Sequence, residues 1–176
     1  MGPTTINGLP AHVLLVHIVV VMVPLTALLL ALSVLWPAAH RRLGLITPLA
    51  AFLTLVSVPL TTHAGEWLEH HTSRDPLTRL HAHMGDQLLV WSAGVFLLSA
   101  LWWALHNEQI RTRLTRSVER SKSVGANRII AVALAVLALG ASTGSVVEVY
   151  RIGDSGAKAA WHDRTTATVP AHSNGN

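Results

Sequence analysis

Long apolar runs, separated by shorter polar segments, make up most of the chain. A helix needs roughly 20 apolar residues to cross the hydrocarbon core of a bilayer, and four runs reach that length. They cover about residues 10–36, 43–65, 84–106 and 128–150. The pattern predicts an all-α fold, an integral membrane four-helix bundle over residues 1–152.

The two ends of the chain need separate interpretation. The first apolar run could be mistaken for a secretory signal, but no Lys or Arg precedes it and it is too long, so we expect it to stay as a mature helix. Residues 153–176 are small, polar and poor in apolar side chains. Such a segment buries too little apolar surface to order itself. We expect a partly disordered C-terminal tail.

Composition supports a membrane protein and narrows the chemistry. Of the 176 residues, 51% are hydrophobic and 12% are charged, whereas a soluble domain carries a charged fraction of about 25%. The chain has no cysteine. Disulfides, thiolate metal sites, iron–sulfur clusters and cysteine nucleophiles are therefore excluded, and any metal or cofactor must be held by His, Met, Asp or Glu.

The placement of basic residues predicts the orientation of the chain. Arg41 and Arg42 follow the first span, and a cluster of basic residues occupies 107–128, after the third span. The positive-inside rule places these two loops in the cytoplasm and both termini outside. The net charge of +4 thus reflects basic loops beside a lipid bilayer, and nucleic acid is not an expected partner.

Eleven histidines are unusual in so apolar a chain. The predicted topology places only His40 and His106 on the cytoplasmic side. The other histidines fall at the outer ends of spans, in the outer loop or in the tail: His12, His17, His63, His70, His71, His81, His83, His162 and His172. Glu66, Asp86 and Glu148 also lie near outer helix ends. Four helices are therefore expected to bring titratable groups together in one leaflet.

His17 is the histidine expected to lie deepest in the membrane, roughly 10 Å inside the start of its helix. An ionisable group at such depth is by default a candidate functional residue. His12 lies five positions earlier, about 140° round the helix, so the two do not share a face. We expect His17 to be buried and to face one cavity together with His83.

Two further patterns resemble metal-binding helix faces. His63, Glu66 and His70 follow an i, i+3, i+7 spacing, which puts them on one stripe if the helix continues through Trp67. On the next span, Asp86 is placed to orient the ring of His83. His81 is expected to point roughly opposite to His83 and to be solvated, as are His70 and His71.

Several short motifs resemble a broad bacterial membrane family catalogued as domain of unknown function 2231. They are Leu9 to His17, similar to an opening His-Pro-x-x-Val-His; Gly65-Glu66-Trp67; the His83 start of span three; and Gly140 to Gly156, with Val149-Tyr150-Arg151 inside it. Val13 and Ile152 depart from the family pattern, where a proline and a histidine are usual. The resemblance covers roughly residues 9–160 and implies four spans in a bacterial plasma membrane, with no assigned reaction.

The histidines suggest two kinds of cofactor for a small membrane subunit. The first is haem b, serving electron transfer or quinone-linked redox chemistry, since iron in haem takes histidine ligands and helix bundles form such pockets. Its candidate cofactor-binding residues are His17, His83, His63, His12, Gly140 and Gly144. The second is a Zn, Cu or non-haem Fe ion, a choice that suits imidazole with carboxylate. Its candidate ligands are His17, His63, Glu66, His83 and Asp86.

A third alternative is a non-catalytic structural subunit of a larger membrane complex or homo-oligomer, whose polar groups only hold helices together. Gly140 and Gly144 form a small-xxx-small face, for which helix packing is the favoured interpretation and approach of a flat ligand the alternative. No Ser-His-Asp order, phosphate loop or dinucleotide motif is present. We therefore do not expect the chain to be an enzyme on its own.

Overall fold

A computed structural model of the chain describes residues 5–6, 9–70, 76–107 and 124–166. Near the N-terminus, strands β1 (Thr5–Ile6) and β2 (Leu9–Pro10) form a short antiparallel pair in which Ile6 is opposite Leu9. Apart from short connections, the rest of the described chain is helical. The helices are α1 (Ala11–Leu35), α2 (Pro37–Leu43), α3 (Ile46–His70), α4 (Pro76–His106) and α6 (Val124–Thr166).

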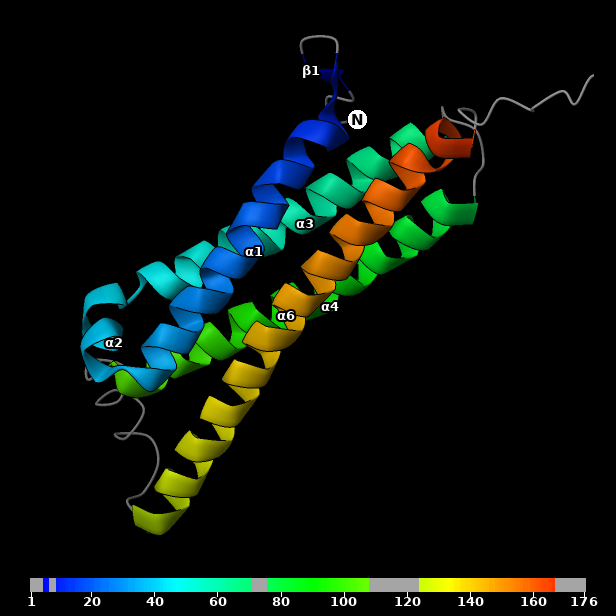
Figure 1. The fold of residues 1–176 in the computed structure, drawn as a ribbon. Coiled ribbons are helices and arrows are strands. Elements are labelled where there is room, and N and C mark those ends of the chain that lie inside the picture. Colours follow the sequence, from blue (N-terminus) through cyan, green and yellow to red (C-terminus); the bar gives the residue numbers. More distant parts are fainter. Residues whose placement is uncertain (1–4, 7–8, 71–75, 108–123, 167–176) are drawn as a thin grey trace, which may run out of the picture.

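Four of these helices are long and apolar enough to cross a membrane. The candidate spans are Ala11–Leu35, Ile46–Trp67, Arg79–His106 and Arg128–Lys158. They run alternately up and down, while the short α2 makes the turn between α1 and α3 (Figure 1). The structure confirms the predicted all-α bundle, and the chain is a multi-pass membrane protein.

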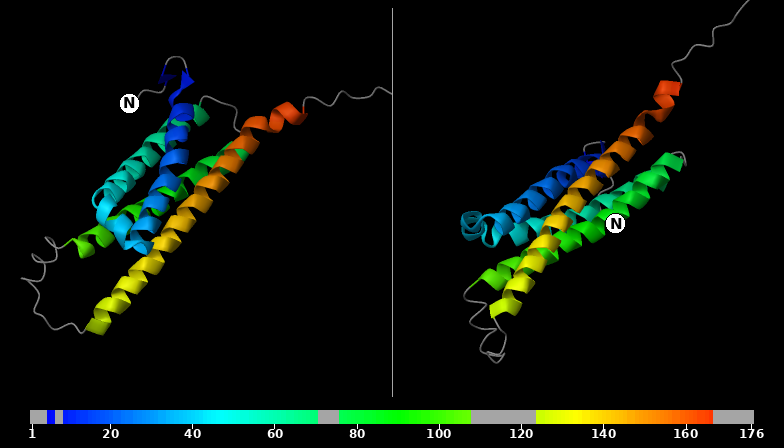
Figure 2. Two further views of the ribbon diagram at one scale, coloured as in Figure 1. Left: turned by 60° about the vertical axis from the view of Figure 1, so that its left-hand side comes forward. Right: turned by 60° about the horizontal axis from the view of Figure 1, so that its bottom comes forward.

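The four spans surround one interior. α1 contacts α3 and α6, and α4 also contacts α3 and α6 (Figure 2). One end of the bundle, here called the His12 end, contains the starts of α1 and α4 and the ends of α3 and α6. The opposite end, called the His40 end, contains α2. The start of α1 and the end of α6 therefore lie at the same end (Figure 1).

Hydroxyl side chains recur at seven-residue intervals on the buried faces. On α3 these are Thr47, Thr54 and Thr61; on α1, Thr26 and Ser33; and on α4, Ser92 and Ser99. Lipid offers no hydrophobic drive for helix association, so small residues that allow close approach favour packing. Most of these hydroxyls donate to a carbonyl of their own helix, as Thr54 does to Ala50 at 2.9 Å, which satisfies them without water.

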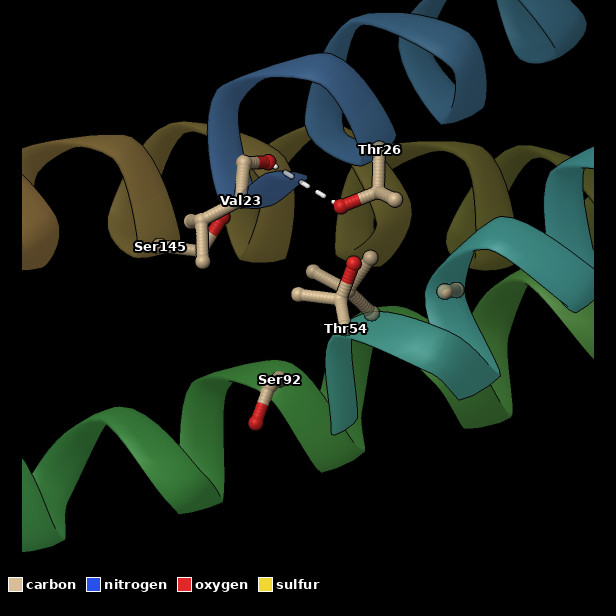
Figure 3. Close-up of a pocket in the computed structure, with 7 residues that line it drawn as sticks. Val23, Thr26, Thr54, Ser92 and Ser145 are labelled. Atoms are coloured by element: carbon tan, nitrogen blue, oxygen red, sulfur yellow. Dashed lines mark hydrogen bonds between the residues drawn. The ribbon is translucent and has the colours of Figure 1, made fainter. Parts of the chain in front are cut away.

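Figure 3 shows the middle of this interior, where Thr26, Thr54, Ser92 and Ser145 come from all four spans. Thr26 Oγ1 donates to the carbonyl of Val23 at 3.0 Å. The gap between the side chains is too narrow to hold a water molecule. The centre of the bundle is therefore a packed contact, and open space lies elsewhere.

Two features differ from the sequence-based expectation. α6 continues through residues 153–166 of the predicted tail, where alanines and an Asp154–Lys158 pair four residues apart favour helix; residues 167–176 lie outside the described part. Gly144 does not pack against the backbone of another helix, which was the expected contact. A Cβ there would collide with the ring of Trp91 from α4, whereas Gly140 has open space around it.

Candidate functional site

His12 lies in the first turn of α1 and is half-buried against α3. Its Nδ1 is 3.0 Å from the carbonyl oxygen of Thr61. A carbonyl only accepts hydrogen bonds, so Nδ1 carries the proton and donates it. The ring also lies on Gly65, where a Cβ would be 3.0 Å from the ring atoms. The absence of a side chain at Gly65 is what lets the imidazole approach α3 so closely.

His81 occupies an equivalent position between α4 and α6. Its Nδ1 is 3.1 Å from the carbonyl oxygen of Ile152 and 3.1 Å from Ser155 Oγ. Ser155 Oγ itself donates to the Ile152 carbonyl at 2.8 Å, so the hydroxyl accepts from His81 and Nδ1 is again the donor. The ring lies on Gly156, where a Cβ would be 2.9 Å from Cε1.

The two imidazoles form a pair at the His12 end. Their ring centroids are 6.3 Å apart and their planes are 85° to one another. Since both Nδ1 atoms donate to backbone carbonyls, Nε2 is the nitrogen that carries a free lone pair in each neutral ring. Histidine ligands of metals are usually held in this way, with one ring nitrogen on a carbonyl and the other on the metal.

The spacing of the pair also suits a shared metal. With metal–nitrogen bonds of about 2 Å, two imidazoles on one ion have ring centres roughly 5 Å apart at a tetrahedral angle and roughly 6 Å apart when they lie on opposite sides of it. The observed 6.3 Å is close to the spacing of the opposite arrangement. The pair could therefore hold one metal centre with small ring movements.

Glu148 is a buried carboxylate on α6, one helical turn before Ile152. Its Oε2 is 3.6 Å from Nη1 of Arg151. Within the described residues its Oε1 has no hydrogen-bond partner. An ionisable side chain inside a span is costly and is commonly functional, so Glu148 is a candidate functional residue in its own right.

His17 and His83 do not lie where the sequence suggested. Both side chains are exposed on the outer surface of the bundle, and the Nδ1 of His17 donates to the carbonyl of Val13 in its own helix at 2.6 Å. The prediction that His17 is buried and shares a cavity with His83 is wrong. The buried face of α1 passes through Val19 and Val23, and His17 is about 200° from Val19 round the helix.

The predicted carboxylate stripes also face outward. α3 does continue through Trp67, which was the condition for the stripe, yet His63 and Glu66 are 75% and 62% exposed, with Nδ1 and Oε2 3.7 Å apart. Asp86 is exposed as well. In the part of the chain that the structure describes, no three His, Asp or Glu side chains group to hold a metal ion. The five-residue set of His17, His63, Glu66, His83 and Asp86 is therefore not brought together.

The two glycines proposed to contact a flat cofactor, Gly140 and Gly144, lie away from the histidine pair. Trp91 covers Gly144, and Gly140 is exposed on the outside of α6. Neither borders the His12–His81 pair, which rests on Gly65 and Gly156. The side chains of His70, His71, His162 and His172 lie outside the described residues.

The expectation that His81 is solvated is wrong. The signal that identifies it is the position of the buried serines of α4, since Ser92 and Ser99 follow His81 by 11 and 18 residues and lie within about 20° of it round the helix. On a helix that is apolar all round, hydrophobicity does not mark the inner face. Small and hydroxyl residues do mark it, and they select His81 over His83.

A second histidine pair lies at the His40 end. The rings of His40 and His106 have centroids 5.0 Å apart, and His106 also lies against Trp102 at 4.4 Å. The Nε1 of Trp102 donates to the carbonyl of Ser33 at 3.2 Å. Burial lowers the pKa of His40 from its usual range, and the positive charges of His106 and Arg41 lower it further.

Comparison with known proteins adds no assignment. No protein-family model, curated protein or solved structure matches the chain. The resemblance to the family of unknown function accordingly stays a prediction.

Proposed function

We propose that the chain is a small membrane subunit that holds a transition-metal centre between His12 and His81 and takes part in electron transfer. The observation that carries this proposal is the geometry of the pair: two imidazoles from different spans, 6.3 Å apart, each with Nδ1 on a backbone carbonyl. In that arrangement the two Nε2 atoms are the ones that can bind a metal.

Two kinds of cofactor could be bound through imidazole ligands: haem b and a bare metal ion. Haem b presents an iron whose two axial positions accept histidine, and it supplies one-electron redox chemistry when bound. A bare Cu, Zn or Fe ion accepts imidazole too and needs further ligands. Haem is the first candidate because two histidines suffice for it.

The cellular setting forms part of the proposal. We place the chain in a bacterial plasma membrane with both termini and the His12 end outside, because the basic loops lie at the opposite side. A larger membrane complex or a homo-oligomer would supply the electron partner. The His12–His81 pair then lies near the outer leaflet.

Purification in detergent, followed by an oxidised and a reduced absorption spectrum and metal analysis, tests the site. His12→Ala and His81→Ala should each lose most of the bound haem or metal, because each removes a ligand. His17→Ala and His83→Ala are matched controls on the same two helices. Their exposed rings lie away from the pair, so these two variants should retain the bound haem or metal.

The spectrum separates the two kinds of cofactor, since haem absorbs strongly in the visible region and a bare ion appears only in metal analysis. Retention of full cofactor content by folded His12→Ala and His81→Ala would contradict the proposal. A protein that takes up neither haem nor Cu, Zn or Fe, yet loses thermal stability in both variants, would show that the pair only holds helices together.

A further inference from the structure

A cleft of about 310 Å³ opens between α4 and α6 at the His12 end. Its apolar lining comes from Leu80 and Met84 of α4. Its polar lining comes from residues 150–158 of α6 and includes Arg151, Asp154 and Lys158. The volume lies at the lower end of the range for small-molecule sites, about 300–1,000 Å³. Apolar and charged walls meet in one opening.

The length of α6 indicates where the cleft lies along the membrane normal. The span Arg128–Lys158 has 31 residues, about 46 Å of helix, whereas the hydrocarbon core is about 30 Å thick. The charged residues 151–158 therefore extend to the level of the lipid headgroups. Tyr150, which is 76% exposed at the edge of the cleft, is typical of residues at the membrane–water interface.

The charges of the cleft favour an anion. Lys158 Nζ donates to Asp154 Oδ2 at 2.6 Å, so these two charges balance. Arg151 contacts Glu148 at 3.6 Å, which is longer than a hydrogen bond. A guanidinium has five N–H donors and binds phosphate oxygens in pairs. Arg151 is thus ion-paired with Glu148 through one nitrogen and keeps its other N–H donors for a phosphate.

We propose that this cleft binds an anionic phospholipid, with its phosphate on Arg151 and its acyl chains along Leu80 and Met84. We assign the phosphate to a lipid because the charged and the apolar side chains line the same cleft. A free anion would contact only the charged side chains. Basic pockets between membrane helices bind lipid headgroups by this chemistry.

The bound lipid would also affect the neighbouring histidine site. Ser155 lines the cleft and accepts a hydrogen bond from His81. A headgroup on Arg151 would hold the end of α6 against α4, where that hydrogen bond is made. The lipid site itself does not depend on a metal at His12 and His81.

The test compares lipids of different charge. Detergent-purified protein is titrated with phosphatidylglycerol or phosphatidylcholine, and binding is followed by thermal shift and native mass spectrometry. Phosphatidylglycerol should bind the wild type about tenfold more tightly than phosphatidylcholine, because both lipids carry the phosphate but the quaternary ammonium of choline cancels its charge and is repelled by Arg151. Raising the salt concentration should reduce the difference.

Arg151→Gln should abolish most of this preference, and Arg151→Lys, which keeps the charge and loses the paired donors, should reduce it a fewfold. Arg128→Gln is the matched control because Arg128 is an exposed arginine at the other end of the same helix. It should behave as wild type. Equal binding of the two lipids, an unchanged preference in folded Arg151→Gln, or occupancy of the cleft by a neutral quinone would each overturn the proposal.

Discussion

At the residue scale, two glycines decide where the imidazoles of His12 and His81 lie. Gly65 and Gly156 leave room for a ring against a helix backbone, at distances of 3.0 Å and 2.9 Å from where a Cβ would be. The rings then reach the carbonyls of Thr61 and Ile152. The glycines therefore act on the site through the histidines.

Gly156→Ala should move the His81 ring and break its hydrogen bond to α6. We expect a loss in metal or haem affinity of about 10- to 100-fold, typical when the group that orients a ligand is lost, with the fold retained. Gly153→Ala is the control, because a Cβ there meets nothing within 4 Å. Cofactor content per purified protein measures both; equal loss in the two variants would contradict the steric argument.

The His40 end should respond to pH. Because the folded-state pKa of His40 is lowered, the unfolded chain binds a proton at higher pH than the folded chain does. Stability is therefore present above the unfolded pKa of about 6.5 and falls as the pH drops below it. Thermal unfolding in detergent between about pH 7.5 and 5 measures this. His40→Asn should flatten the dependence, and an unchanged slope would exclude His40 as its source.

At the element scale, each span presents a seven-residue repeat of small and hydroxyl residues to the interior. Ser92 and Ser99 mark it on α4, and Ala138 and Ser145 mark it on α6. The Trp91–Gly144 contact shows how the two helices fit, since the indole occupies the space that a side chain at residue 144 would need. This contact replaces the backbone approach expected from the glycine spacing.

Gly144→Leu should displace Trp91 and separate α4 from α6. Overpacking of this kind costs about 1–3 kcal/mol and sometimes more. Gly140→Leu is the matched control, because residue 140 is exposed and a Cβ there has open space. Thermal unfolding in detergent should show a lower midpoint for Gly144→Leu than for Gly140→Leu. Equal midpoints would mean that α6 can shift to accept the larger side chain.

At the scale of the whole molecule, four spans place the start of α1 and the end of α6 at one end of the bundle (Figure 1). The positive-inside rule predicts that this end is the outer one. Because the His12–His81 pair and the α4–α6 cleft both lie there, orientation decides which compartment reaches them.

Cysteine labelling tests the orientation directly, since the natural chain has no cysteine. Lys158→Cys, at the His12 end, should react with a membrane-impermeant maleimide in intact cells. Arg41→Cys, in α2 at the His40 end, should react only after the membrane is permeabilised. The reverse result would place the histidine pair in the cytoplasm.

By itself the sequence determined the number of spans, because a bilayer requires about 20 apolar residues per crossing and the polar segments separate four such runs. It also determined that the two termini share a side and that any metal must be held without thiolates. It did not determine which histidines point inward. On helices that are apolar all round, lipid-facing and buried faces have similar hydrophobicity, so the depth of His17 and the carboxylate spacing on α3 carried no information about direction.

Only the tertiary structure decided that His12 and His81 form the pair. Their meeting requires glycine gaps on α3 and α6, far from either histidine in the sequence, and carbonyl acceptors that become available where the helices cross. Such a site depends on which helix backbones are close enough to touch. That closeness is set by the packing of small side chains from four separate spans, and no single segment contains it.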